Sequence, residues 1–257
     1  IELRIPQIEA LKVIDESIVV NKNVILSIPT GIGKTIITFE YIRKYNKSVV
    51  VFVPTLILLE QWSNEAIKYG IPHNKILQIG TGYHSNVNNL DLSTYLLVIC
   101  VNNSVDIIKE HLSVFNKIFI DEAHRINIPK IYLDDNFGIS DEDNNIIIEE
   151  EISDNEEDVE TNSDNMDIEP TTDINTTNVD IDNENTYIDT LKKIIKTSTN
   201  IIMMSATIDK YPNYLYYSYS IRDAINQGYL SDYQIICPIF TTDPTDNNIA
   251  TYIIKQG

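Results

Sequence analysis

The chain has 257 residues, 38 of them acidic and 19 basic, and a formal net charge of −19 at pH 7. This length suits one sizeable α/β domain and part of another, and no apolar run approaches the length that spans a membrane. The start carries no basic-then-apolar leader, and two cysteines argue against a disulfide framework, so we expect an intracellular protein of the nucleus or cytoplasm.

A glycine-containing turn joins the first expected strand to a helix. Residues 24–28 form an apolar run of strand length, and residues 36–42 have helical spacing. Gly31 and Gly33 let the backbone turn sharply, and the following helix directs its positive end at the turn. Several amide N–H groups would then converge on one point, an arrangement that suits a polyphosphate.

The same turn carries a P-loop pattern, although the full pattern has glycine where this chain has Ile28. In that pattern Lys34 reaches the β- and γ-phosphates of the nucleotide, and the Thr35 hydroxyl ligates magnesium. The predicted nucleotide-binding residues of the loop are Pro29, Thr30, Gly31, Ile32, Gly33, Lys34 and Thr35. The alternative is a strand-to-helix turn that binds no ligand.

Strands and helices continue to alternate along the chain. We expect a strand at 49–53, a helix at 56–69 and strands near 75–79 and 96–101. Such alternation predicts an α/β fold with a mainly parallel sheet that helices cover on both faces. A nucleotide should lie at the carboxyl ends of the strands.

A carboxylate pair follows the next strand-like run, residues 117–120. A parallel sheet would put this run beside the P-loop strand. Asp121 would then hold the magnesium ion through its water shell, and Glu122 would orient and deprotonate the attacking water. The alternative is a solvated acidic loop.

The acidic excess belongs to one segment. No Lys or Arg lies between Lys130 and Lys192, yet that interval holds 21 of the 38 acidic residues, so the remaining 17 face all 19 basic ones. Residues 134–189 lack the apolar content to offset their ordering entropy, and we expect a disordered surface insertion. It could mimic nucleic-acid charge, screen a basic track or bind a basic protein partner, or be an unselected expansion.

After this segment we expect a helix around 187–197, a strand at 201–204 and a Tyr-rich stretch at 211–219. The ordered motifs resemble the first RecA-like domain of superfamily-two helicases and nucleic-acid translocases. The likeness covers most of residues 1–130 and 190–240. It implies an ATP- and magnesium-dependent motor with a RecA-like P-loop fold, in which Gln7 contacts the adenine edge; read alone, Gln7 is more typical of a surface residue before a helix.

The resemblance also implies contacts with a nucleic-acid backbone. These residues are Pro54, Thr55, Thr81, Gly82, Asn102 and Asn103. Such contacts to phosphates read no base sequence. Read alone, the Pro-Thr pair is equally an ordinary helix entry, and an aromatic such as Trp62 on an amphipathic helix is more often core than a base-stacking platform.

The resemblance also implies residues that couple the nucleotide site to the nucleic-acid track. His124, next to the carboxylate pair, would hydrogen-bond the hydroxyls of Ser205 and Thr207 and so link the nucleotide site to the nucleic-acid track. Residues 220–230 resemble the short helix by which DNA-repair, phage recombination and poxvirus transcript-release helicases enter their second domain. This favours DNA over RNA as the substrate.

We therefore divide the chain into a first part of the motor domain (1–133), the acidic insertion (134–189), the final part (190–230) and the start of a second domain or linker (231–257). We expect a fragment that hydrolyses ATP poorly, because the family's second domain supplies an arginine finger. The leading hypothesis is an ATP-dependent DNA helicase or translocase.

Alternatives are an RNA helicase, a nucleotide-switched binding module and a translocating subunit of a restriction or remodelling assembly. The frequent Asn, Ile, Lys and Tyr suggest an AT-rich genome of a large DNA virus or a protist. A viral origin would put the protein in viral factories.

Overall fold

The computed structural model describes residues 2–84, 86–126 and 181–232. Its centre is a seven-stranded sheet in which every pairing is parallel, with strand order β3-β4-β2-β5-β6-β1-β7. The strands are β1 Val24–Ser27, β2 Val49–Val53, β3 Ile76–Ile79, β4 Leu97–Val101, β5 Lys117–Ile120, β6 Ile201–Ser205 and β7 Leu215–Ser218. This confirms the predicted parallel α/β fold.

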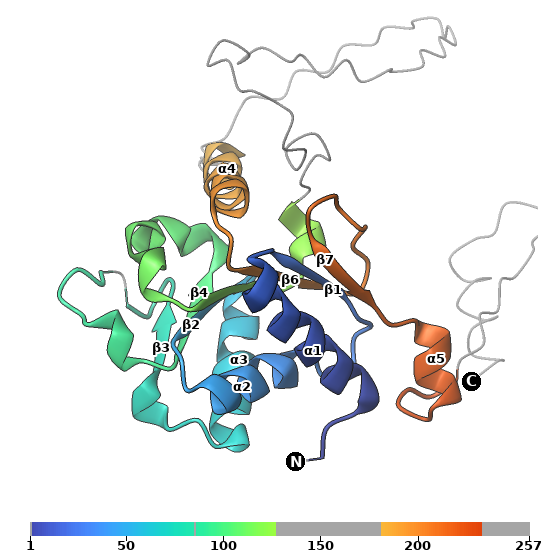
Figure 1. Cartoon of the computed structure of the whole chain (residues 1–257). Coiled ribbons are helices and arrows are strands. Elements are labelled where there is room, and N and C mark those ends of the chain that lie inside the picture. The colour runs from blue at the N-terminus through green and yellow to red at the C-terminus, as the bar shows by residue number, and fades with distance from the viewer. Residues whose placement is uncertain (1, 85, 127–180, 233–257) are drawn as a thin grey trace, which may run out of the picture.

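Helices cover both faces of the sheet (Figure 1). The α-helices are α1 Ile5–Val20, α2 Lys34–Tyr45, α3 Leu56–Tyr69, α4 Ile181–Thr197 and α5 Ile221–Asn226. Short 3-10 turns are η1 His73–Lys75, η2 Leu92–Thr94, η3 Asn102–Ile107, η4 Lys109–Val114 and η5 Ala123–Ile126. Figure 1 shows α1, α2 and α3 on one side of the sheet and α4 on the other.

Alternate residues of the strands pack into two separate hydrophobic cores, one on each face of the sheet. Val49, Val51 and Val53 of β2 pack into the core under α1 to α3, whereas Val50 and Phe52 pack into the core on the α4 side. All five are fully buried. A strand buried on both faces needs an unbroken apolar run, which is why residues 49–53 show no alternation of polar and apolar residues.

Helix α3 has the bounds that the sequence predicts, Leu56–Tyr69. Thr55 caps its start, because the Thr55 hydroxyl accepts a hydrogen bond from Leu58 N at 3.3 Å. Gly70 ends it with a φ of +104°, a left-handed conformation that glycine adopts without a steric penalty.

Three local features of the structure go beyond the sequence predictions. Gln7 does not precede a helix on the surface: it lies in the first turn of α1 and is 4% exposed. The Tyr-rich stretch contains the edge strand β7, which pairs with β1. Helix α4 begins at Ile181, so the end of the segment expected to be disordered is helical.

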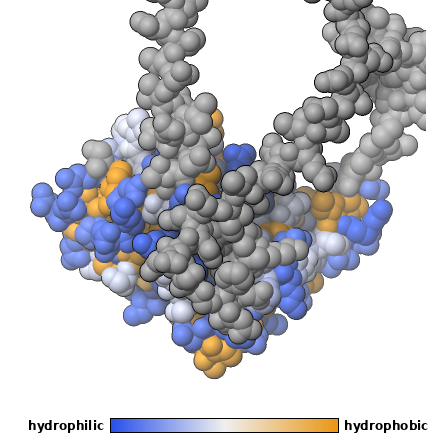
Figure 2. Space-filling view, turned by 90° about the horizontal axis from the view of Figure 1, so that it is seen from above, coloured by the Kyte–Doolittle hydropathy of each residue, from blue (hydrophilic) through white to orange (hydrophobic). Residues whose placement is uncertain are grey.

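The rest of the acidic segment up to residue 180, and the strand expected at 233–240, lie outside the described residues. None of the described helices is long and apolar enough to cross a membrane. On the face in Figure 2, hydrophilic residues are interspersed with hydrophobic ones in the part that is coloured.

Candidate nucleotide site and nucleic-acid interface

The loop between β1 and α2 has the backbone that a phosphate cradle requires. Gly31 and Gly33 have φ values of +85° and +91°, in the region that L side chains rarely adopt. At Gly33 a Cβ atom would also lie 2.6 Å from Gln7 Nε2. Any larger residue there would strain the loop and push against α1.

The start of α1 is bonded to this loop. Gln7 Nε2 donates to Ile32 O at 2.9 Å and to Gly33 O at 3.3 Å, and Arg4 Nη1 donates to Gly31 O at 2.7 Å. Gln7 Oε1 in turn accepts from Arg4 N at 2.9 Å. The structure thus brings Gln7 to the predicted nucleotide site; its contact with an adenine edge stays a prediction.

Lys34, the first residue of α2, is only 8% exposed. Its Nζ donates to Ile28 O at 3.2 Å, just beyond the end of β1. The ammonium group is therefore held beneath the loop by the protein itself. Thr35 follows on the first turn of α2 and is half-buried.

Asp121 comes directly after β5 and is 7% exposed. Trp62 Nε1 donates to Asp121 Oδ2 at 2.9 Å, and Glu122 N donates to Asp121 Oδ1 at 3.0 Å. Burial raises the pKa of the Asp121 carboxyl, while the Trp62 hydrogen bond and the Lys34 charge act in the opposite direction. Both carboxylate oxygens thus have a donor that fixes their orientation.

The strand that carries the carboxylates is not the direct neighbour of the P-loop strand. β6 lies between β5 and β1, with Ile120 opposite Met203 and Leu26 opposite Met204. The expected adjacency of the two strands was wrong. The insertion of β6 brings its last residue, Ser205, between the P-loop and the carboxylate pair.

Glu122 has a φ of +49°, which costs a non-glycine residue energy and is often retained at functional sites. His124 Nδ1 lies 3.4 Å from Glu122 Oε2 and 2.8 Å from Ser205 Oγ. The Ser205 hydroxyl also accepts a hydrogen bond from Thr207 N at 3.2 Å. The three residues expected to couple the two sites are thus brought together.

A cavity of about 350 Å³ opens beside this group. Its walls come from the ends of β1 and β6 and from η5: Ser27, Ala123, His124, Thr207, Ile208, Asp209 and Tyr211. His124 and Thr207 line it, whereas residues 29–35 of the P-loop do not. The His124 imidazole is therefore accessible from outside the nucleotide loop.

The residues of this site fit a magnesium nucleotide. Within the described ranges no three His, Cys, Asp or Glu side chains cluster as a metal cage. Magnesium does not require such a cage, because it commonly uses one or two carboxylates together with phosphate oxygens and water. Asp121 and Thr35 supply the donor types that this coordination needs, and Lys34 supplies the charge for the phosphates.

Trp62 belongs to the core, as its position on an amphipathic helix predicts. It is 2% exposed, and its ring packs edge-on against Phe39 with centroids 5.6 Å apart. Its hydrogen bond to Asp121 was not anticipated. A buried indole N–H needs an acceptor, but nothing in the sequence indicates which one.

The predicted nucleic-acid contacts follow the ends of β2, β3 and β4 and therefore share one edge of the sheet. Thr55, Thr81, Gly82 and Asn103 are exposed, and Pro54 is half-buried. Asn102 differs, since it is 6% exposed and its Oδ1 has no hydrogen-bond partner among the described residues. Parallel packing thus gathers the residues in a row, while their contact with nucleic acid stays a prediction.

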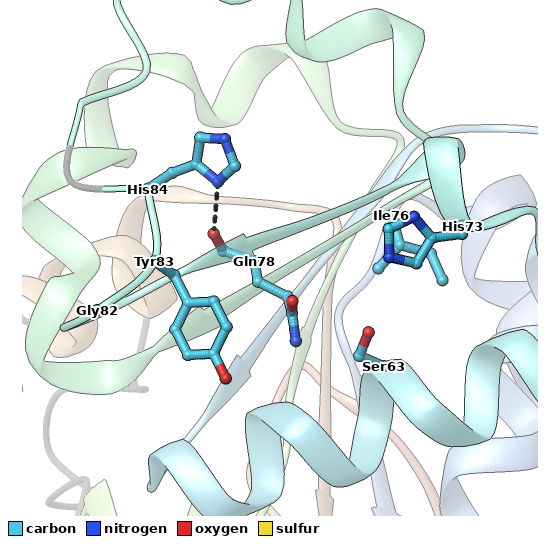
Figure 3. Close-up of a pocket in the computed structure, with 7 residues that line it drawn as sticks. All are labelled: Ser63, His73, Ile76, Gln78, Gly82, Tyr83 and His84. Atoms are coloured by element: carbon cyan, nitrogen blue, oxygen red, sulfur yellow. Dashed lines mark hydrogen bonds between the residues drawn. The ribbon is translucent and has the colours of Figure 1, made fainter.

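A second cavity of about 380 Å³ lies where this row meets the outer strand β3. Ser63, His73, Ile76, Gln78, Gly82, Tyr83 and His84 line it (Figure 3). His84 Nδ1 lies 3.2 Å from Gln78 O, and Tyr83 donates from its hydroxyl to Glu60 at 2.8 Å. Sequence reasoning found only Gly82 of this group, since α3 brings the rest together with β3.

Comparison with known proteins identifies the family. Residues 1–210 match the family described as Type III restriction enzyme, res subunit. The chain belongs to this family. Membership confirms the predicted resemblance. The chain carries a RecA-like motor domain of the superfamily-two helicase type. Such a family implies the use of ATP, typically with a divalent metal.

Individual relatives are more distant. The putative helicase 161L of Invertebrate iridescent virus 6 is 25% identical over 124 residues, which are 48% of this chain and 27% of that protein. The UvsW helicase of bacteriophage T4 has a TM-score of 0.47 at 16% identity, over 85% of this chain and 60% of its own. A hypothetical ATP-dependent RNA helicase from Sulfolobus tokodaii scores 0.48 at 17% identity, over 91% and 52%. The match to the iridescent-virus protein thus spans about a quarter of that relative.

Proposed function

We propose that this chain is the nucleotide-hydrolysing motor domain of an ATP-dependent helicase or translocase that acts on DNA. The arrangement around Asp121 carries the proposal. A buried carboxylate fixed by Trp62 stands beside Glu122, and His124 links Glu122 to Ser205. Together with the buried Lys34 and the P-loop, this is the set of groups that phosphoryl transfer to water needs.

Each residue then has a distinct role in hydrolysis. Lys34 and the P-loop amides would bind the phosphates. Thr35 and Asp121 would hold a magnesium ion, which would offset the phosphate charge when bound. Glu122 accepts a proton from water as the water oxygen attacks the γ-phosphorus and the bond to the β-phosphate oxygen breaks. ADP and inorganic phosphate are the products.

His124 transmits the state of this reaction. Its Nδ1 is within reach of both Glu122 Oε2 and Ser205 Oγ, at 3.4 and 2.8 Å. A shift of the Glu122 carboxylate during hydrolysis would therefore change the contact with Ser205, whose hydroxyl accepts from Thr207 N. This chain of contacts ends at the cavity beside Thr207, where a moving segment could respond.

The row at the ends of β2, β4 and β3 is proposed to bind the nucleic-acid backbone. Its exposed hydroxyl, amide and glycine groups suit phosphate and sugar contacts that read no sequence. The resemblance of residues 220–230 to the helicase entry helix favours DNA. An RNA helicase is the alternative, because the motif at Asp121 to His124 does not separate the two substrates.

A nucleotide-switched binding module without turnover is the other candidate. The intact Lys34, Thr35, Asp121 and Glu122 argue against it, because a module that only binds nucleotide has no need for a positioned base.

The test is steady-state ATP hydrolysis by the complete polypeptide, with the second domain that would supply the arginine finger, in the presence of duplex DNA, single-stranded DNA or RNA. Glu122→Gln removes the base, and Glu110→Gln, which changes an exposed carboxylate on η4, is the matched control. Stimulation by DNA that Glu122→Gln abolishes and Glu110→Gln retains supports the proposal. Stimulation by RNA alone favours the RNA helicase, and nucleotide binding without any turnover, with or without nucleic acid, favours the switch module.

A further inference from the structure

The turn that follows α5 lies directly against the P-loop. Ser220 caps the helix by accepting from Asp223 N at 3.0 Å. Gly228, with a φ of +71°, reverses the chain after it. Leu230 then returns so close to the nucleotide loop that a Cβ atom on Gly31 would meet Leu230 Cδ2 at 2.9 Å. The segment leaving the domain and the phosphate loop are therefore in contact.

This turn is anchored rather than loosely apposed. The amides of Tyr229 and Leu230 both donate to Ala224 O, at 2.8 and 3.1 Å. Ala224 is fully buried in the core under α1 to α3, and both turn residues are half-buried against the same core. The positions of the Tyr229 ring and the Leu230 side chain are consequently set by the fold.

Tyr229 faces the residue that clamps the nucleotide loop. The Arg4 guanidinium carbon lies 5.3 Å from the centroid of the Tyr229 ring, and Tyr229 Oη accepts from Ile5 N at 3.4 Å. Arg4 meanwhile donates to Gly31 O. Arg4 is thus held between an aromatic ring of the exit turn and the backbone of the P-loop.

A second tyrosine near Tyr229, Tyr219, has a buried hydroxyl. Tyr219 follows β7, and its backbone N–H donates to Ser27 O at 2.9 Å. Its hydroxyl is buried and has no partner among the described residues. Burial raises the pKa of Tyr219, and the nearby Tyr229 adds to this effect. The Tyr219 side chain thus lies near Tyr229 with a hydroxyl that has no hydrogen-bond partner within the described chain.

We propose that Tyr229 is a nucleotide-positioning residue, which holds the Arg4 guanidinium in place as the wall of the base-binding end of the ATP site. The inference rests on the proposed ATP site. A guanidinium that is placed over one aromatic ring by cation–π attraction can also stack on a nucleobase through its planar surface. Gln7, three residues along α1, would lie at the edge of the same base.

A regulatory consequence follows from where Tyr229 comes in the chain. It belongs to the segment that leaves the domain, not to the P-loop or to α1. A base stacked on Arg4 therefore stabilises the docked turn, and undocking of the turn weakens base binding, because binding energies couple reciprocally. Nucleotide occupancy would then control whether the turn at Tyr229 and Leu230 stays docked.

The experiment compares two ligands, magnesium ATP and magnesium tripolyphosphate, by calorimetric titration of the whole chain. Tripolyphosphate occupies the phosphate cradle but has no base. Tyr229→Ala should weaken ATP binding about tenfold, the size expected for a lost stacking contact, and leave tripolyphosphate binding unchanged. Tyr229→Phe keeps the ring and should bind ATP within about twofold of the parent.

Two further variants make the result specific. Tyr217→Ala removes a tyrosine of β7 that bonds Glu9 instead of Arg4 and should leave both ligands unaffected. Arg4→Lys keeps the charge but loses the flat guanidinium, so it should reproduce the selective loss of ATP even where Tyr229→Ala folds poorly.

Equal weakening of both ligands by Tyr229→Ala and Arg4→Lys would overturn the proposal, since the turn would then only support the loop. Unchanged ATP binding in both variants would overturn it as well. Failure of the parent chain to bind either ligand would instead contradict the proposed nucleotide site itself, and this inference with it.

Discussion

The carboxyl ends of the parallel strands carry two groups of predicted site residues. The group around β1, β5 and β6 differs from the group around β2, β4 and β3 in how its side chains are held. Around β1, β5 and β6 three predicted site residues, Lys34, Asp121 and Ser205, are buried. Each is hydrogen-bonded to the protein: Lys34 to Ile28 O, Asp121 to Trp62 and Ser205 to His124. Around β2, β4 and β3 most of them are exposed, and Thr81 has no hydrogen bond within the described chain.

This difference suits the two proposed ligands. Hydrolysis of a phosphoanhydride needs groups fixed in advance, because preorganised charges cost no reorganisation in the transition state. Contacts to a passing nucleic-acid backbone need exposed groups that release each phosphate again. We therefore expect substitutions at the nucleotide end to change rates strongly, and substitutions at the outer end to change affinity mildly.

The largest effect should come from Glu122→Gln. Removal of a general base typically lowers a rate by about 10²–10⁴-fold, and ATP binding should change little because the amide keeps the shape of the side chain. Single-turnover hydrolysis and nucleotide titration would measure the two quantities separately. Equal loss of both would indicate that Glu122 supports the fold of the loop, not the chemistry.

Trp62→Phe should weaken magnesium-dependent ATP binding by about tenfold, because partners that orient a metal ligand typically contribute 10–100-fold. Phenylalanine keeps most of the packing but cannot donate to Asp121. Phe39→Leu, which alters the ring packed on Trp62 but keeps the hydrogen bond, is the control. A similar loss in both variants would assign the effect to packing.

Acid should weaken magnesium ATP binding earlier than an ordinary aspartate would. Burial raises the pKa of Asp121, so the folded protein holds that proton more tightly than the unfolded chain does. The carboxylate therefore becomes protonated above the usual Asp range near 3.9. Titrations from neutral pH to about 4.5 should show the decline, and Asp121→Asn should remove this pH dependence along with most of the affinity.

At the outer end, Thr81→Ala should weaken DNA binding about threefold, the size of one net hydrogen bond. Its free energy of unfolding should stay within about 0.5 kcal/mol of the parent, since the side chain is exposed. Fluorescence anisotropy with labelled duplexes and urea denaturation measure the two quantities. Thr197→Ala, at the end of α4, is the matched control. A tenfold or larger loss of DNA affinity in Thr81→Ala would contradict the expectation that substitutions at the outer end change affinity mildly.

A separate prediction concerns the stability of the fold, at a residue that belongs to neither site. Lys117, at the other end of β5 from Asp121, is 4% exposed, and its Nζ donates to Ser17 Oγ at 3.1 Å. Burial lowers its pKa. Lys117→Met should therefore raise the free energy of unfolding by about 1 kcal/mol at neutral pH.

The sign follows from proton binding. Between the lowered folded pKa and the usual lysine value near 10.4, the unfolded chain binds more protons, so the stability of the parent rises with pH in that window. Urea denaturation at neutral and alkaline pH should show this rise in the parent and in Lys12→Met, an exposed control, but not in Lys117→Met. A slope that persists in Lys117→Met would assign it to another group.

The sequence by itself determined the class of fold, and it predicted the chemistry of a nucleotide site. Apolar runs of strand length and helical spacing are local properties, which is why the bounds of α3 and β5 agree with the prediction. The P-loop and the carboxylate pair are recognisable for the same reason. Their chemistry depends on residue types at fixed spacing after a strand.

Only the tertiary structure decided which distant residues meet. It inserted β6 between the two motif strands, made β7 an edge strand beside β1, and brought Trp62 to Asp121 and Tyr229 to Arg4. These contacts join residues 59 and more positions apart. Strand order and long-range packing depend on how the whole chain buries its two cores, and no local pattern encodes that choice.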